Sequence, residues 1–377
     1  MFRPHLAVGV VCLAGTFACS AAVSESDDAE ASSASEALRG HGRPSAVFTS
    51  SNSAEGNSVL AFRRSPRGNL EMVGDYATGG LGTGMGLGSQ GALAVSEEGR
   101  FLVTVDAGSN EITSFAVHGA ELSLRSHVSS NGTRPVSVAI QDHRVYVVNA
   151  GEPANVAGYR LGPDGTLTPI PGSIQPLSAT AAGPAQVGIS PRGNVLVVTE
   201  KATSRISTFG IGRSGALTPR GAFASAGTTP FGFTFTPQGD LIVSEAGTAS
   251  TSSYDVHRSG QVTVISAAVP DLQRAPCWAT VSPDGHFAYI ANAGSSSISG
   301  YHVDPNGGLT LLHPDGITGA AGQNSRPLDM AVVDRDLYLL DAGNHGISHF
   351  RIAPDGNLNL SESELSLPAT AAGLAAY

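Results

Sequence analysis

The chain has 377 residues and a formal net charge of −10, and 14% of its residues are charged while 41% are hydrophobic. This apolar content excludes a disordered chain, because it is sufficient to build a packed core. An acidic chain without clusters of Lys and Arg lacks the positive surface that binds phosphate backbones, so the sequence predicts no nucleic-acid partner.

The first 19 residues have the pattern of an export signal. Arg3 precedes an apolar run from Leu6 to Ala18, which is too short to span a bilayer. Small residues around position 20 suit an ordinary signal peptidase, whereas residues 16–19 form a loose lipobox in which Cys19 would carry the lipid. Both alternatives predict an extracytoplasmic protein, which is secreted or periplasmic and touches a membrane only through that anchor.

Residues 20–44 are rich in Ser, Ala, Asp and Glu, which cannot bury a core, so a solvated tether is expected there. Beyond this tether, Cys277 is the only cysteine. A lone cysteine supports neither a disulfide framework nor a cysteine metal site. The histidines show no metal-ligand spacing either, and the sequence predicts no cofactor and no metal.

One structural unit recurs from residue 45 to the end of the chain. An apolar strand leads through a turn to a second apolar strand, and the turn is plainest at Ser190–Gly193 and Ser282–Gly285, where Pro and Gly favour a hairpin. A third strand such as Ile298–Tyr301 and a fourth that opens after a glycine complete the unit. Four short strands at a period in the forties are typical of a β-propeller, and residues 45–377 divide into seven such units.

The two ends of this region supply complementary parts of one blade. Val47–Asn52 looks like a second strand that lacks a first, and the tail 371–377 looks like a first strand without a successor. We expect them to pair and close the ring, since closure leaves no long unpaired edge between blades. The sequence therefore predicts an all-β, seven-bladed propeller over residues 45–377.

The repeat resembles the lactonase-type seven-bladed propellers, the family of bacterial 6-phosphogluconolactonase and fungal carboxymuconate cyclase. The runs Val281–Asn292, Ser297–Val303 and Ile189–Phe209 carry this resemblance. It implies an enzyme that hydrolyses a lactone. A Gly-Pro-Arg-His segment at the start of an inner strand of the family enzymes reads Gly183-Pro184-Ala185-Gln186 here, and an Asn-Glu pair of that family reads Thr199-Glu200.

Propeller topology brings the starts of the innermost strands and the ends of the second strands to one mouth of the ring. The strand starts bring candidate binding side chains to it, namely Arg134, Gln186, Trp278, Arg326 and Asp329. The ends of the second strands are all acidic or amide residues, namely Asn52, Asp106, Asn149, Glu200, Glu245, Asn292 and Asp341. The glycine-rich run 79–88 is expected to be a flexible loop over the same mouth.

These residue types suggest a hydrolytic site. Glu200 or Glu245 would act as a general base on water, and Arg134 or Arg326 would hold a carboxylate or phosphate in its planar fork. Trp278 would either plug the axis or form a stacking floor for a flat ligand.

The amides of Asn149 and Asn292 would contact the substrate or, in the alternative, satisfy local backbone groups. The expected partner is a small carbohydrate-derived or carboxylated ligand at the mouth. Three functions follow: an exported hydrolase of a lactone or sugar-acid ester, a non-catalytic propeller that binds a glycan, peptide or protein, and a muconate-type cyclase or isomerase.

Overall fold

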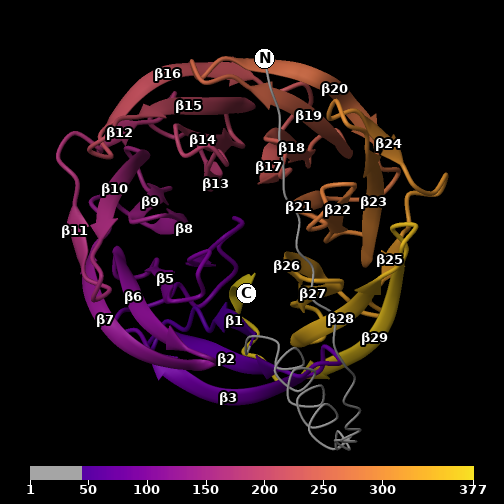
Figure 1. Cartoon of the computed structure of the whole chain (residues 1–377), viewed down its shortest axis with the longest axis horizontal. Coiled ribbons are helices and arrows are strands. Elements are labelled where there is room, and N and C mark those ends of the chain that lie inside the picture. The colour runs from indigo at the N-terminus through magenta and orange to yellow at the C-terminus, as the bar shows by residue number, and fades with distance from the viewer. Residues whose placement is uncertain (1–44) are drawn as a thin grey trace, which may run out of the picture. The chain divides into compact units, whose positions relative to one another are not determined.

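The computed structural model describes residues 45–377, apart from the side chains of residues 362–365. Within this range the chain forms thirty strands and no helix. The strands are arranged in seven sheets around a central axis, with the chain travelling once around the ring (Figure 1). The predicted leader, the Cys19 lipidation site and the tether all lie outside the described residues. In the described part, no helix is both long and apolar enough to cross a membrane.

Six blades are continuous in sequence and are numbered in chain order. Within each of them, the strands follow one another from the innermost to the outermost. Blade 1 contains β4 (Leu93–Val95), β5 (Phe101–Asp106), β6 (Glu111–His118) and β7 (Glu121–Ser129). Blade 2 contains β8 (Pro135–Gln141), β9 (Arg144–Asn149), β10 (Asn155–Leu161), β11 (Leu167–Pro169) and the short β12 (Gln175–Pro176). Blade 3 contains β13 (Pro184–Ile189), β14 (Val195–Glu200), β15 (Arg205–Ile211) and β16 (Leu217–Ala224).

The remaining blades repeat this arrangement. Blade 4 contains β17 (Pro230–Phe235), β18 (Asp240–Glu245), β19 (Ser250–Val256) and β20 (Val262–Pro270). Blade 5 contains β21 (Pro276–Val281), β22 (Phe287–Asn292), β23 (Ser297–Val303), β24 (Leu309–Leu311) and the short β25 (Gly319–Ala320). Blade 6 contains β26 (Pro327–Val333), β27 (Asp336–Asp341), β28 (Gly346–Ile352) and β29 (Leu358–Leu365).

Blade 7 joins the two ends of the described chain, as the sequence predicts. Its innermost strand is β30 (Ala372–Ala376), followed outwards by β1 (Ala46–Ser50), β2 (Ser58–Arg64) and β3 (Leu70–Ala77). The Thr49 hydroxyl donates to the carbonyl of Gly373 at 2.6 Å. The last residue, Tyr377, donates its hydroxyl to the carbonyl of Gly119 in blade 1 at 2.7 Å, so the tail also ties the closing blade to its neighbour.

The predicted hairpin turns between the first and second strands are confirmed. The amide of Gly193 donates to the carbonyl of Ser190 at 2.7 Å, and Gly193 has a φ of +68°. Gly285 forms the same bond to Ser282 at 2.8 Å with a φ of +76°. A residue with a Cβ would be strained at these positive φ values, so both turns require glycine.

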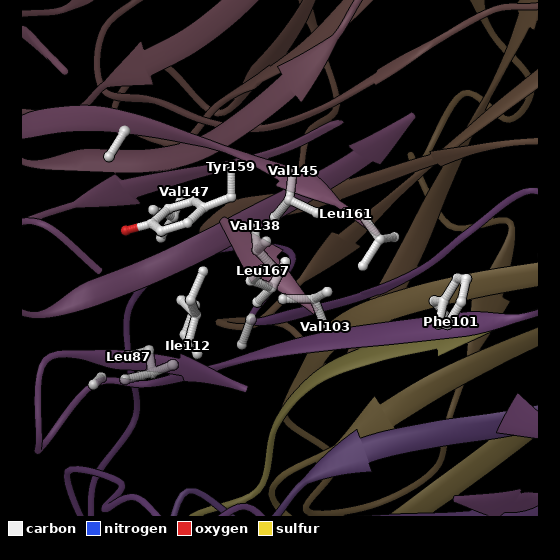
Figure 2. Packing of buried hydrophobic residues seen from close by; sticks show 14 of the residues in the cluster. Leu87, Phe101, Val103, Ile112, Val138, Val145, Val147, Tyr159, Leu161 and Leu167 are labelled. Atoms are coloured by element: carbon white, nitrogen blue, oxygen red, sulfur yellow. The ribbon is translucent and has the colours of Figure 1, made fainter. Parts of the chain in front are cut away.

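The hydrophobic core lies between adjacent blades. Between blades 1 and 2, Val103 and Ile112 pack with Val138, Val145 and Tyr159, all of which are almost fully buried (Figure 2). Because each blade covers the face of the next, apolar residues occur on both faces of the inner strands, and the closed ring buries most of them.

A repeated tyrosine also fixes the spacing of the blades. The tyrosine in the second strand of blades 2, 5 and 6 donates its hydroxyl to a glycine carbonyl in the outer turn of the following blade. These contacts are Tyr146 to Gly215 at 2.8 Å, Tyr289 to Gly356 at 2.9 Å and Tyr338 to Gly68 at 2.6 Å.

Candidate functional site

The first and second strands meet at the predicted mouth with a recurring register. In five blades a proline that opens the innermost strand lies opposite the polar residue that ends the second strand. The pairs are Pro135 with Asn149, Pro184 with Glu200, Pro230 with Glu245, Pro276 with Asn292 and Pro327 with Asp341. In these five blades the start of the innermost strand and the end of the second strand therefore lie side by side at the same edge of the sheet.

Glu200 is buried at this edge, and its carboxylate is fully engaged. Ser178 donates to it from both its backbone N–H, at 3.1 Å, and its hydroxyl. Thr203 and Ser207 donate their hydroxyls at 2.7 and 2.6 Å. Glu200 thus stabilises the connection between blades 2 and 3. Because its carboxylate oxygens are buried and occupied by these donors, the placement does not favour its predicted role as a general base.

Glu245 is also buried, between blades 3 and 4, but its hydrogen bonds go to Oε1, and its buried Oε2 atom has no hydrogen-bond partner. It is fully buried and accepts hydrogen bonds from Ser225 at 2.6 Å and Tyr254 at 2.9 Å. Burial raises the pKa of this carboxyl above its ordinary value. Both glutamates are therefore shielded from a ligand at the mouth, and their catalytic role stays a prediction.

Asn149 and Asn292, the two asparagines predicted to contact the substrate, form hydrogen-bond contacts with neighbouring parts of the chain. Asn149 donates to the carbonyl of Ser130 at 3.1 Å and to the side chain of Asn155 at 2.8 Å. The amide of Asn292 lies 3.2 Å from the hydroxyl of Ser297 and 2.8 Å from that of Ser299. These contacts match the alternative in which such residues satisfy local polar groups.

The centre of the ring is crossed by Gly88–Gly91, which we call the axial segment. Figure 1 shows the chain before β5 reaching into the middle of the ring. The backbone N–H of Gln90 donates to the carbonyl of Ala185 in blade 3 at 3.0 Å. The Gln90 side chain exchanges two hydrogen bonds with Ala279 in blade 5, at 2.7 and 2.9 Å. The predicted loop over the mouth thus ends in a segment at the centre of the ring that contacts blades 3 and 5.

Trp278 and Asp329 hold this segment in place. The indole N–H of Trp278 donates to the carbonyl of Ser89 at 2.9 Å, and its ring packs edge-on against Phe231 at a centroid distance of 5.0 Å. Asp329 accepts the amide N–H of Gly91 at 3.0 Å, and burial raises its pKa to about 7. Of the two roles predicted for Trp278, the geometry matches the axial plug.

The other predicted binding residues differ in their exposure. Gln186 is tied to blade 4, because its side-chain oxygen accepts the amide N–H of Phe233 at 2.6 Å. Arg134 and Arg326 are exposed, and their backbone N–H groups donate to Asn110 at 2.7 Å and to Asp341 at 2.8 Å. Two arginines at the mouth are therefore exposed to solvent, and each is held in place through its backbone.

Sequence reasoning missed one residue of the mouth, Lys201. It follows Glu200 directly and is half-buried, and its ammonium group donates to the carbonyl of Gly88 and lies 5.0 Å from the centroid of the Phe231 ring. Burial, together with the positive charge of Arg134, lowers the pKa of Lys201 to about 8. The signal in the sequence is that Lys201 is the only lysine among 21 Lys and Arg residues.

The mouth also contains a thiol. Cys277 is buried, and burial raises its pKa to about 12, so the reactive thiolate is disfavoured there. Among the side chains that the structure describes, no group of three or more His, Cys, Asp or Glu residues is placed to hold a metal ion.

A family model described as "Lactonase, 7-bladed beta-propeller" matches residues 55–176 and 155–273, together more than half of the chain. The chain belongs to this lactonase propeller family. No curated protein matches the sequence of this lactonase-family propeller.

Solved structures share the architecture of this lactonase-family propeller. A candidate 6-phosphogluconolactonase of Bacteroides uniformis aligns with a TM-score of 0.70 and 20% identity over 87% of this chain and 98% of its own. A second, from Bacteroides fragilis, aligns with a TM-score of 0.71 and 18% identity over 89% and 98%. The periplasmic gluconolactonase of Pseudomonas aeruginosa aligns with a TM-score of 0.67 and 15% identity over 88% and 98%. At these identities the likeness shows the fold alone.

Proposed function

We propose that this lactonase-family propeller hydrolyses a lactone or sugar-acid ester at its mouth, with Lys201 as the general base and Arg134 as the anion clamp. The placement of the chain's only lysine carries this proposal, because Lys201 is half-buried beside Phe231 and close enough to Arg134 for that charge to affect it. A pKa lowered to about 8 leaves part of the amine neutral near neutral pH, as a general base requires.

The proposed reaction uses water as the nucleophile. The neutral Nζ atom of Lys201 accepts a proton from water while the water oxygen attacks the acyl carbon. The bond between that carbon and the ring oxygen then breaks. The released alkoxide takes up the proton held by Nζ of Lys201, which gives a hydroxy acid and returns the lysine to its neutral form. The guanidinium of Arg134 would hold a carboxylate or phosphate elsewhere on the substrate.

We place this activity outside the cytoplasm. The support is the predicted export signal in residues 1–19 and the periplasmic location stated for the Pseudomonas gluconolactonase. A sugar-derived or carboxylated lactone outside the cytoplasm remains the proposed partner.

One observation favours the second function, a propeller that binds without catalysis. The axial segment occupies the centre of the ring, and Glu200 and Glu245 are both fully buried, so neither carboxylate is exposed to a ligand for acid–base catalysis. In that case Arg134 and Arg326 would provide a recognition surface for an anionic partner.

A lactone panel that includes glucono-1,5-lactone tests the proposal. We expect kcat to fall by a factor of about 10² to 10⁴ in Lys201→Met, because general-base catalysis contributes about that much. Lys201→Arg retains the positive charge but cannot act as a base, so it should be equally impaired. Arg134→Ala should raise KM, and Glu200→Gln, the matched change at the neighbouring carboxylate, should leave kcat within about threefold in the folded enzyme.

Hydrolysis that survives Lys201→Met but is lost in Glu200→Gln would transfer the base role to the glutamate. A wild-type protein that hydrolyses no lactone of the panel would favour the binding function.

A further inference from the structure

A basic groove lies between blades 2 and 3, at the end of the strands opposite the mouth. Its volume is about 440 Å³, and three arginines line it, Arg144 at the start of β9, Arg160 near the end of β10 and Arg213 in the outer turn of blade 3. Arg144 and Asn149 begin and end the same extended strand, so the groove and the mouth are on opposite faces of the ring.

The register of blade 2 places two of these positive charges side by side. Arg144 and Arg160 are directly opposite each other on the antiparallel strands β9 and β10. Like charges in such a pair destabilise a sheet. At the corresponding register of blade 6, Asp336 lies opposite Arg351 and forms an ion pair with it at 2.6 Å.

The charge in the groove is not balanced by its own lining. No carboxylate lies among its lining residues, and none of the three arginines forms an ion pair with a described Asp or Glu side chain. The next groove, between blades 3 and 4, has a balanced lining of two arginines and two acids, Arg192, Arg258, Asp240 and Asp255. In a chain with a net charge of −10, the three arginines are a local excess of positive charge.

The lining of the groove is apolar beside the arginines. Pro163 is exposed and provides the apolar contact surface of the groove, above the buried side chains of Leu161 and Ile170. A volume of about 440 Å³ falls within the range of small-molecule sites. The ligand chemistry that fits both features is an anionic group attached to an apolar body.

We propose that this groove binds a small organic anion, in which a phosphate or carboxylate contacts Arg144, Arg160 and Arg213 and an apolar part the size of an aromatic ring packs against Pro163. The guanidinium forks suit the planar or tetrahedral oxygens of such groups. The bound anion would also offset the repulsion between Arg144 and Arg160. This site is separate from the proposed lactone site and does not depend on it.

Calorimetric titration with phenyl phosphate and with benzoate tests the proposal, and inorganic phosphate serves as the comparison. We expect at least one aromatic anion to bind with a Kd below about 1 mM, and inorganic phosphate to bind at least about tenfold more weakly than phenyl phosphate. Arg144→Gln and Arg213→Gln should each weaken aromatic-anion binding about tenfold. Arg192→Gln, the matched change in the balanced groove, should leave it unchanged, as should Lys201→Met at the mouth.

Three results would overturn the proposal. Equal binding of inorganic and phenyl phosphate would reduce the groove to a counterion site. Loss of binding in Lys201→Met would place the ligand at the mouth. Absence of binding by both aromatic anions, in a protein that melts cooperatively, would remove the site altogether.

Discussion

Replacement of Gln90 by leucine tests whether the axial segment holds the ring together. The change keeps a similar volume but removes both side-chain hydrogen bonds to Ala279, which are 2.7 and 2.9 Å long. Ala279 is 1% exposed, so its N–H and C=O groups would be left buried without these partners. Each such loss costs about 1 to 3 kcal/mol, and we expect the free energy of unfolding to fall by about 3 kcal/mol in total.

Urea unfolding measures this loss, and the protein supplies its own reporter. Trp278 is the only tryptophan, and its indole N–H donates to Ser89 next to Gln90, so its emission should shift in the variant. Gln261→Leu, at an exposed turn position, is the matched control and should change the free energy of unfolding by less than about 0.5 kcal/mol. A Gln90→Leu effect as small as the control, with unchanged emission, would refute the bridging role of the segment.

Three further changes test other parts of the structure. Deletion of residues 371–377 removes β30 and should open the ring, and a truncated protein that stays monomeric with an unchanged Tm would contradict closure. Arg144→Glu should place a negative charge directly opposite Arg160 and raise the free energy of unfolding, measured by urea titration, by about 0.5 kcal/mol. A decrease in the free energy of unfolding would show that the two arginines do not repel each other. Because burial lowers the Lys201 pKa from 10.5 to about 8, the unfolded chain holds this proton more tightly. The stability of the wild type relative to Lys201→Met should therefore rise between pH 8 and 10.5, by about 1 to 3 kcal/mol, and a difference independent of pH would argue against a desolvated amine.

The sequence predicted the architecture well because the information for it is local and repeated. Turns such as Ser190–Gly193 specify a hairpin within a few residues, and the unit occurs often enough to count the blades. The incomplete units at the two ends predicted the pairing of β1 with β30, which the structure confirms. Each of these inferences needed only short-range chemistry and the requirement that a ring must close.

The candidate site was less predictable, because its contacts join distant parts of the chain. The position of Glu200 at the end of β14 followed from the repeat, but the donors that occupy it include Ser178 from the preceding inter-blade connection. The axial segment depends on Ala185 and Ala279, which are far from Gln90 in sequence. No local pattern predicts such contacts.

One departure from the family pattern gains a physical meaning in the structure. The family's Gly-Pro-Arg-His segment reads Gly183-Pro184-Ala185-Gln186 here, and the carbonyl of the fully buried Ala185 accepts the Gln90 N–H. The chain therefore carries a small residue where the axial segment packs, and the positive groups of the mouth are Arg134, Arg326 and Lys201 instead. The chemistry we propose follows from these residues and not from the family's arginine and histidine.

The pH dependence of kcat/KM, measured for the most reactive lactone of the panel after subtraction of the uncatalysed rate, tests the role of Lys201 most directly. A lysine base whose pKa is lowered to about 8 predicts a rate that rises with pH through that value in the wild type and a flat, much lower profile in Lys201→Met. A rising limb near pH 4 to 5, the ordinary range of a carboxylate, that persists in Lys201→Met would contradict the assignment.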